Sequence, residues 1–200
     1  MLAVLLALIA AAPTERWTLY GGDTVAAGTD VFVGETGWPS TSFGWTHGLT
    51  DTTDAGVRFD ILYAFETTTD THFGLGVRVP LRAVVLRTTS GMSLLVRADP
   101  GLKVYPGSGT PWGFSFPASA LVGFNLNPDL RLALGVDVPM AFLFSPAQFV
   151  IGTEFGFGMD YLLDPRLIAG FNIRLGPVFS SEANGSRFGL VTQIGLAYKM

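Results

Sequence analysis

The most regular pattern of apolar and polar positions lies between residues 112 and 144. From Trp112 to Asn125 every even position is apolar, and the positions between them are mostly small or polar. After a turn at 127–129 the alternation resumes and continues to Phe144. Because successive side chains of a β-strand point to opposite faces, this pattern predicts a β-hairpin with one wholly apolar face.

The same alternation recurs along most of the chain. A polar stretch at 99–101 keeps the parity of the residues around it, so we expect one bulged strand over 92–104 and not two short ones. Two further strands are expected within 30–49, and 17–20 gives a weak strand signal. Short connections predict antiparallel pairing of neighbours. The eight regular predicted strands are 57–66, 73–85, 92–104, 112–125, 130–144, 149–161, 166–176 and 187–199.

Two closed architectures fit such a meander. A soluble barrel places apolar residues inside and charges outside, whereas a membrane barrel does the reverse. In the regular strands the charged residues share the polar face, together with many of the 25 glycines. Those charged residues are Arg58, Asp60, Glu66, Arg78, Arg82, Arg97, Asp99, Lys103, Arg131, Asp137, Glu154, Asp160, Arg166, Arg174, Arg187 and Lys199.

The glycines favour the membrane architecture. Glycine weakens an exposed strand, but it leaves room inside a narrow barrel in which a few long side chains must fit. The apolar face carries more Phe, Leu and Val than a barrel of this size could enclose, and an open apolar face of that extent is unstable in water. We therefore predict an all-β, antiparallel, up-and-down transmembrane β-barrel of about ten strands, with eight as the alternative.

Composition supports this prediction. Charged residues are only 14% of the 200 residues while apolar residues reach 48%, and soluble domains usually contain roughly 25% charged residues. The formal net charge of −4 gives no reason to expect a nucleic-acid partner. The chain has no cysteine, which excludes disulfides, thiolate metal sites and a cysteine nucleophile.

The chain divides into three parts. Residues 1–12 are apolar and end in small residues, as in the hydrophobic and cleavage regions of a secretory signal peptide. They lack a basic start, so the true beginning of the signal is expected upstream. Residues 13–28 form an N-terminal segment, and residues 29–200 form the barrel domain.

At the level of architecture, the chain from Asp30 to Met200 resembles the small outer-membrane β-barrel proteins of Gram-negative bacteria. In that family the final strand usually ends in an aromatic residue that the outer-membrane assembly machinery recognises. Tyr198 ends the apolar face of the last strand here, although Lys199 and Met200 follow it. The resemblance implies an exported monomer in the bacterial outer membrane, with membrane lipids and the assembly machinery as partners.

The charges on the polar face are the candidate functional residues, because in a membrane barrel they line the lumen. Ten basic and six acidic residues give this face a positive surplus. One hypothesis is a basic lumen that passes small anions. The other is a network of salt bridges that closes the lumen, since unpaired charges there are costly. The lumen-lining charges that we single out are Arg58, Asp60, Arg78, Arg82, Arg97, Asp99, Lys103, Arg131, Asp137, Glu154 and Arg174.

Catalysis has little support in the sequence. His47 and His72 are the only histidines, and no serine is placed with either of them and an orienting carboxylate. We expect no enzyme, no metal site and no cofactor. The expected role is structural or that of a narrow, mostly closed passage, and the alternatives are a small anion-selective pore and a lipid-modifying enzyme.

Overall fold

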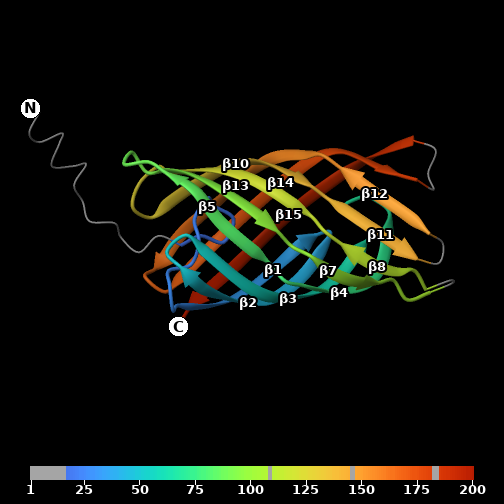
Figure 1. Ribbon diagram of the computed structural model, residues 1–200, viewed down its shortest axis with the longest axis horizontal. Helices are drawn as coiled ribbons and strands as arrows, with labels where there is room; N and C mark the ends of the chain where they lie inside the picture. Colours follow the sequence, from blue (N-terminus) through green and yellow to red (C-terminus); the bar gives the residue numbers. More distant parts are fainter. Residues whose placement is uncertain (1–16, 108–109, 145–146, 182–184) are drawn as a thin grey trace, which may run out of the picture.

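The computed structural model describes residues 17–107, 110–144, 147–181 and 185–200, so the expected signal segment lies outside the described residues. Fifteen antiparallel strands form one sheet (Figure 1). Among the described residues, no helix combines the length and apolar character needed to cross a membrane. The strands are β1 (Asp30–Trp38), β2 (Ser40–Thr50), β3 (Thr53–Ala64), β4 (Thr71–Arg78), β5 (Leu81–Arg87), β6 (Met92–Ala98), β7 (Gly101–Val104), β8 (Trp112–Ser115), β9 (Ala118–Asn125), β10 (Leu130–Val138), β11 (Met140–Phe144), β12 (Gln148–Gly152), β13 (Glu154–Asp164), β14 (Leu167–Ser180) and β15 (Gly185–Lys199).

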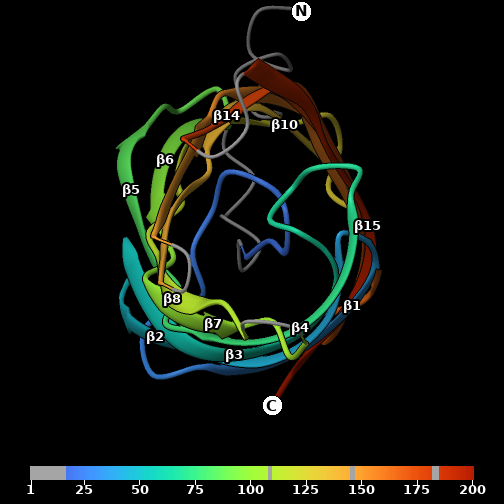
Figure 2. The same ribbon diagram turned by 90° about the vertical axis from the view of Figure 1, so that its right-hand side faces the viewer.

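The sheet closes on itself. One wall contains the uninterrupted strands β3, β2, β1, β15 and β14, each paired with the next. The remaining wall joins β14 to β3 along two routes, through β13, β10, β9, β6 and β5 or through β12, β11, β8, β7 and β4. Figure 2 looks along the axis of this ring. We call the end near the C-terminus and the 88–91 turn the terminal end, and the opposite end the far end.

The predicted count of about ten strands is wrong, and so is the alternative of eight. Five expected long strands are each divided in two, at 79–80, 99–100, 116–117, 139 and 153, and the single bulged strand expected over 92–104 is therefore β6 and β7. Four of these breaks contain proline, which has no N–H to donate to a ladder. Pairing continues across the breaks because the proline carbonyls accept hydrogen bonds: Gly56 N–H donates to Pro80 O (2.9 Å), Val79 N–H to Pro100 O (2.8 Å), Asp99 N–H to Pro117 O (2.9 Å) and Gly152 N–H to Pro139 O (3.0 Å).

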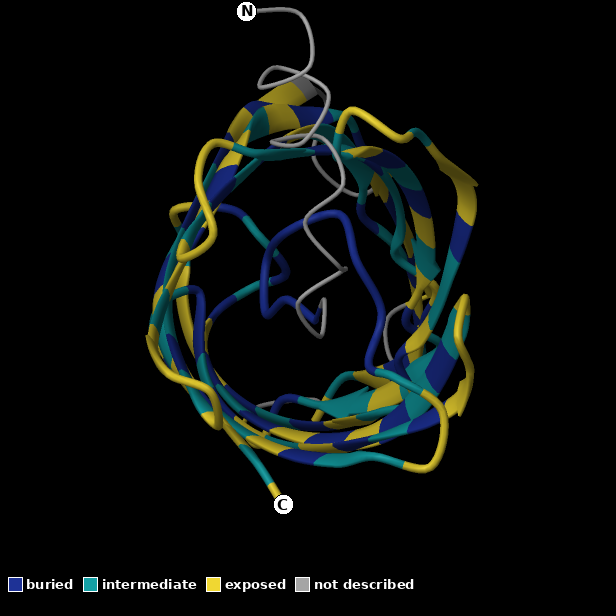
Figure 3. Cartoon of the chain, turned by 90° about the vertical axis from the view of Figure 1, so that its left-hand side faces the viewer, coloured by how far each residue is buried: buried dark blue, intermediate teal, exposed yellow. Residues whose placement is uncertain are grey.

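The two faces of the sheet differ as the alternation predicts. Apolar side chains point outward: Phe155 and Ile194 are each 59% exposed, and Phe114 is 40% exposed. Glycines, charged residues and a few apolar side chains face the interior. One interior apolar cluster contains Val84, Leu95 and Leu121 on strands that lie side by side. Figure 3 shows buried and exposed residues alternating along the strands.

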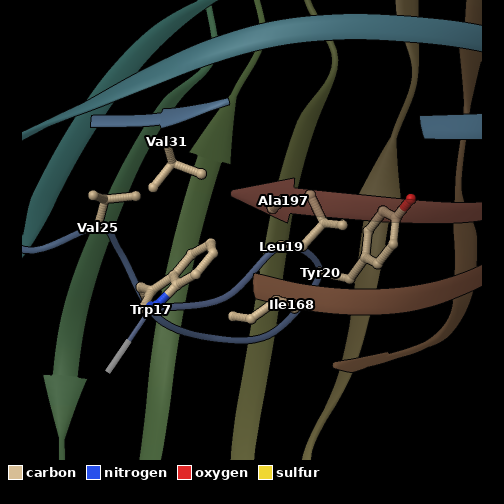
Figure 4. Close-up of a cluster of buried hydrophobic side chains, with 7 residues drawn as sticks. All are labelled: Trp17, Leu19, Tyr20, Val25, Val31, Ile168 and Ala197. Carbon is tan, nitrogen blue, oxygen red and sulfur yellow. The ribbon is translucent and has the colours of Figure 1, made fainter. Parts of the chain in front are cut away.

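The weak strand predicted at 17–20 is not a strand. Residues 17–25, which we call the N-terminal plug, form an irregular buried segment inside the ring (Figures 2 and 3). Trp17, Leu19, Tyr20 and Val25 pack there against a cluster completed by residues of the wall (Figure 4). The apolar residues at 17–20 therefore reflect burial in the lumen and not pairing in the sheet.

Contact between the plug and the wall requires glycine on both sides. A Cβ atom added at Gly123 would lie 2.8 Å from both Gly22 Cα and Ser93 Oγ. We expect Gly123→Val to lower the free energy of unfolding in detergent by about 1–3 kcal/mol, the usual cost of overpacking. The measurement is the urea dependence of tryptophan fluorescence. Gly34→Val is the control, because a Cβ at Gly34 meets nothing nearer than Phe43 Cδ1 at 4.0 Å. Equal destabilisation by both substitutions would contradict the packing described here.

Candidate functional site

The interior of the ring is the candidate site, and the plug occupies its terminal end. Asp160 on β13 accepts hydrogen bonds from three successive backbone N–H groups of the plug, those of Leu19 (3.1 Å), Tyr20 (3.1 Å) and Gly21 (2.8 Å). A carboxylate that accepts several backbone N–H bonds forms a strong, directional anchor. The carboxylate of Asp160 is buried, so these bonds also supply the polar partners that it needs.

Basic residues of the wall hold the plug carbonyls. Arg82 Nη1 donates to Thr18 O (2.9 Å), and Arg131 Nη1 donates to Trp17 O. Arg82 also forms an ion pair with Asp54 (2.7 Å), whose carboxylate accepts the Val25 N–H (2.7 Å). The wall therefore contacts the plug backbone along most of its length.

Two more contacts bind the middle of the plug. Ser93 Oγ donates to Gly22 O (2.7 Å), and Arg87 forms an ion pair with Asp23 (2.7 Å). Simple alternation from the inward-facing Arg82 would place Arg87 on the outer face of β5. A register shift between Val84 and Leu86 reverses the alternation, so the Arg87 side chain reaches the plug. Burial raises the pKa of the Tyr20 phenol, because the ionised form would be poorly solvated there.

A network of ion pairs crosses the middle of the lumen. Arg78 Nε lies 2.6 Å from Asp60 Oδ2, and its Nη1 lies 3.5 Å from Asp99 Oδ2. Arg97 pairs with Asp99, and Arg58 lies 3.6 Å from Asp60 while also pairing with Glu35. Five predicted lumen residues thus join one network. Arg174 and Asp137 form a separate pair (3.0 Å), and Asp137 lies opposite the buried Glu154 in the strand register.

Residues 65–70, which we call the inner loop, contact interior residues at the far end of the ring. Glu66, with a backbone φ of 54°, turns its carboxylate inward. Lys103 Nζ donates to Glu66 Oε2 (2.6 Å), and the Tyr105 hydroxyl donates to Glu66 Oε1 (3.0 Å). Phe65 packs against two interior apolar clusters, one with Leu62, Tyr105 and Leu143, the other with Ala141, Val150 and Val178.

The inner loop also completes the wall. The pairing of β1 with β15 ends at Trp38 and Thr192. The first part of β15, from Gly185 to Val191, therefore has no partner on β1. The loop takes that place. Leu190 N–H donates to Thr67 O (2.8 Å), Thr68 bridges to Gly189, and Trp38 Nε1 donates to Thr68 O (3.2 Å).

The positive surplus predicted for the lumen is wrong. Glu35 and Asp54 also face the interior and are buried, each paired with an arginine. Arg166 and Arg187, which were expected inside, are exposed near strand ends. The parity of Asp54 matches that of Arg58 and Asp60, so β3 could have been extended back to it. The plug contacts have no comparable signal in the sequence.

The histidines lie away from this network. His47 Nδ1 lies 2.8 Å from Asp30 Oδ1, which also accepts a hydrogen bond from Trp45 Nε1 (3.0 Å). His72 packs edge-on to Phe65. Within the part of the chain that the structure describes, no group of three or more His, Asp or Glu residues could hold a metal ion.

No protein family model and no curated protein matches the sequence. The outer membrane channel DcaP of Acinetobacter baumannii is similar in structure, with a TM-score of 0.38 and 15% sequence identity. The match covers 92% of this chain and 65% of the channel, so the chain spans somewhat less than two thirds of that protein.

The anchor on the plug can be tested by changing one atom. We expect Asp160→Asn to weaken the attachment of the plug to the wall by about 1.5–3 kcal/mol, because an amide oxygen replaces a charged acceptor of three N–H groups. Hydrogen exchange at residues 19–21 measures this and should accelerate. Asp129→Asn, in the exposed 126–129 turn, is the control and should leave exchange unchanged. Unchanged protection in Asp160→Asn would show that the carboxylate does not hold the plug.

Proposed function

We propose that this protein is an outer-membrane β-barrel whose lumen is a narrow, mostly closed passage. The observation that carries the proposal is a closed sheet with an apolar exterior and a charged interior. Closure pairs the backbone of neighbouring strands all the way round, as hydrocarbon requires of any structure that spans it. The exterior is covered by large apolar side chains, for which lipid is a better solvent than water.

Aromatic side chains near both ends of the strands support a membrane location. At the far end, the rings of Trp112 and Phe144 lie 4.7 Å apart, and Phe142 and Phe144 lie 4.9 Å apart. At the terminal end, Trp45 and Tyr198 are exposed on the outer surface, and the Trp45 indole donates to Asp30. Apolar rings with polar tips are typical of the interfacial girdles of membrane barrels.

The contents of the lumen favour a closed passage. The plug blocks the terminal end, ion pairs cross the middle and the inner loop blocks the far end. Among the described residues, buried acids such as Glu35 and Asp54 offset the interior bases, which removes the charge surplus behind an anion-selective pore. A structural role, or a passage that opens only when one blocking segment moves, fits these contacts better than a permanently open pore.

The proposal includes two partners. Membrane lipids cover the exterior, and the outer-membrane assembly machinery inserts the chain by engaging the last strand. The apolar side chains Ile194, Leu196 and Tyr198 on β15 are exposed on one face and are available for that recognition. A monomer satisfies the pairing of the sheet without a second copy.

A substitution on the outer surface tests the membrane location. Leu134 lies within β10 and is 50% exposed, whereas Leu126 is 60% exposed in a turn outside the strands. We expect Leu134→Arg to weaken folding into lipid vesicles by about 2–4 kcal/mol and Leu126→Arg by about 0–1 kcal/mol, since the cost of arginine depends on depth in the bilayer. Migration of unboiled and boiled samples on a detergent gel reports folding. Equal tolerance of both substitutions would argue against a bilayer-spanning ring.

Conductance tests whether the lumen is closed. In a planar bilayer we expect the wild-type protein to show no steady current at moderate voltage. Asp160→Asn should open more often, because the plug loses its anchor, while Asp129→Asn should behave as wild type. A steady anion-selective conductance in the wild-type protein would overturn the closed reading.

A further inference from the structure

The wall of the ring has a notch near the far end. The β1–β2 hairpin turns at Pro39, so residues 185–191 of β15 have no partner on β1. On the other side of the notch, the ladder between β2 and β3 ends at the pair of Ser40 with Leu62. The inner loop fills the notch as irregular backbone and not as a strand, and it extends into the ring beside β15 (Figure 2).

The notch lies within the apolar part of the exterior. Phe188 on β15 is exposed on one side of it, and Tyr63 on β3 and Phe73 on β4 are exposed on the other. At the depth of the hydrocarbon, irregular backbone is tolerated only where protein covers it or where it lines a cavity. The position of the inner loop therefore calls for an explanation beyond that of an ordinary turn between two strands.

A cavity of about 120 Å³ lies behind the inner loop. Every side of the notch contributes to its lining. The contributing residues are Glu66 and Thr67 of the inner loop, Val191 of β15, Ser40 of β2 and Leu62 of β3. The inner loop is thus the layer that separates this cavity from the outer surface of the ring.

Isolated contacts, and not a ladder, join the inner loop to the edges of the notch. Besides its two backbone contacts with β15, the loop accepts a hydrogen bond at Thr68 O from Trp38 Nε1 (3.2 Å). Asp70 also forms an ion pair with Arg187, but both side chains are partly exposed, and such pairs contribute little. This seam is therefore held more weakly than the neighbouring ladders of β14 with β15 and of β2 with β3.

The backbone of the inner loop is strained near its start. Glu66 has a φ of 54°, in the left-handed region that residues other than glycine rarely occupy. Such a conformation persists only where its surroundings impose it, and here Lys103 and Tyr105 hold the Glu66 carboxylate. Strained residues of this kind are common in segments that switch between two positions.

We propose that the inner loop is a side gate, which leaves the notch to connect the cavity with the bilayer and not with either end of the lumen. The solute that it admits is small, uncharged and partly apolar. The basic residues of the lining are already paired with acids, so a charged solute would have to displace a pair. Leu62 and Val191 offer apolar contacts, and Ser40 and Gln193 offer hydrogen bonds. The inference rests on the proposed membrane location.

Because the chain has no cysteine, a single introduced thiol reports where the cavity opens. Ser40→Cys places that thiol at a buried position on the lining. In vesicles we expect an uncharged, bilayer-soluble maleimide to label it about tenfold faster than a charged maleimide, because a charged group enters hydrocarbon poorly. Each rate is normalised to that of the unfolded protein. Equal or faster labelling by the charged reagent would overturn the side gate, and so would no labelling by either reagent.

Trp38→Phe tests the gate itself. Added to Ser40→Cys, it removes the indole donor to Thr68 O and should speed labelling by the uncharged reagent about fivefold, the shift in open population expected for the loss of one hydrogen bond. Trp45→Phe is the matched control, since it removes an indole hydrogen bond to Asp30 at the terminal end and should leave the rate unchanged. Equal rates with and without Trp38→Phe would contradict gating by the inner loop.

Two further cysteine positions keep the test decisive. Val191→Cys lines the cavity from the other edge of the notch and replaces Ser40→Cys if that variant does not fold. Ser115 is buried but does not line the cavity, so Ser115→Cys should stay unlabelled, and equal labelling there would indicate general opening of the ring and overturn the proposal. Gel migration scores insertion separately. Protein that inserts but stays unlabelled would refute the side gate alone, whereas protein that does not insert would refute the proposed membrane function.

Discussion

The pairing of β1 with β15, together with the two routes that join β14 to β3, closes the sheet, and the rest of the structure depends on that closure. Once the sheet is closed, every strand residue faces either a narrow interior or the surroundings. Each described strand is paired on both sides over most of its length, which leaves little edge for pairing with another chain. The same pairing supplies partners for the backbone groups of the wall, which is what allows an exterior as apolar as this one.

The narrow interior explains which residues occupy it. Glycine leaves space where another backbone approaches, as at Gly123 against the plug. Long basic side chains reach across the lumen, and short acids near the wall neutralise them. Burying such charges is costly unless they are paired and hydrogen-bonded, so the charged residues form connected networks with few groups left without partners. Among the described residues, a few buried polar atoms have no hydrogen-bond partner, for example the Tyr20 hydroxyl, Asn172 Oδ1 and Glu154 Oε1.

Proline accounts for four of the five interruptions of the strands. The unbroken parity through Pro100 correctly indicates that β6 and β7 lie in one line, yet it hides the missing N–H that ends the first strand. Carbonyl groups of the prolines accept hydrogen bonds from the neighbouring strand, which keeps the two parts aligned. Parity therefore reports the face that a side chain occupies, and the ladder reports where a strand ends.

The sequence by itself determined the all-β class, the antiparallel order and which side chains share a face, because alternation with a period of two is a local property of each strand. It did not determine what fills the interior. The plug is held by residues such as Asp160, about 140 positions away along the chain, and those contacts exist only after closure brings the wall around it. Glu35 and Asp54 likewise pair with arginines of other strands, Arg58 and Arg82. Only the tertiary structure could decide that the N-terminal plug lies inside the ring at one end and that the inner loop turns inward at the other.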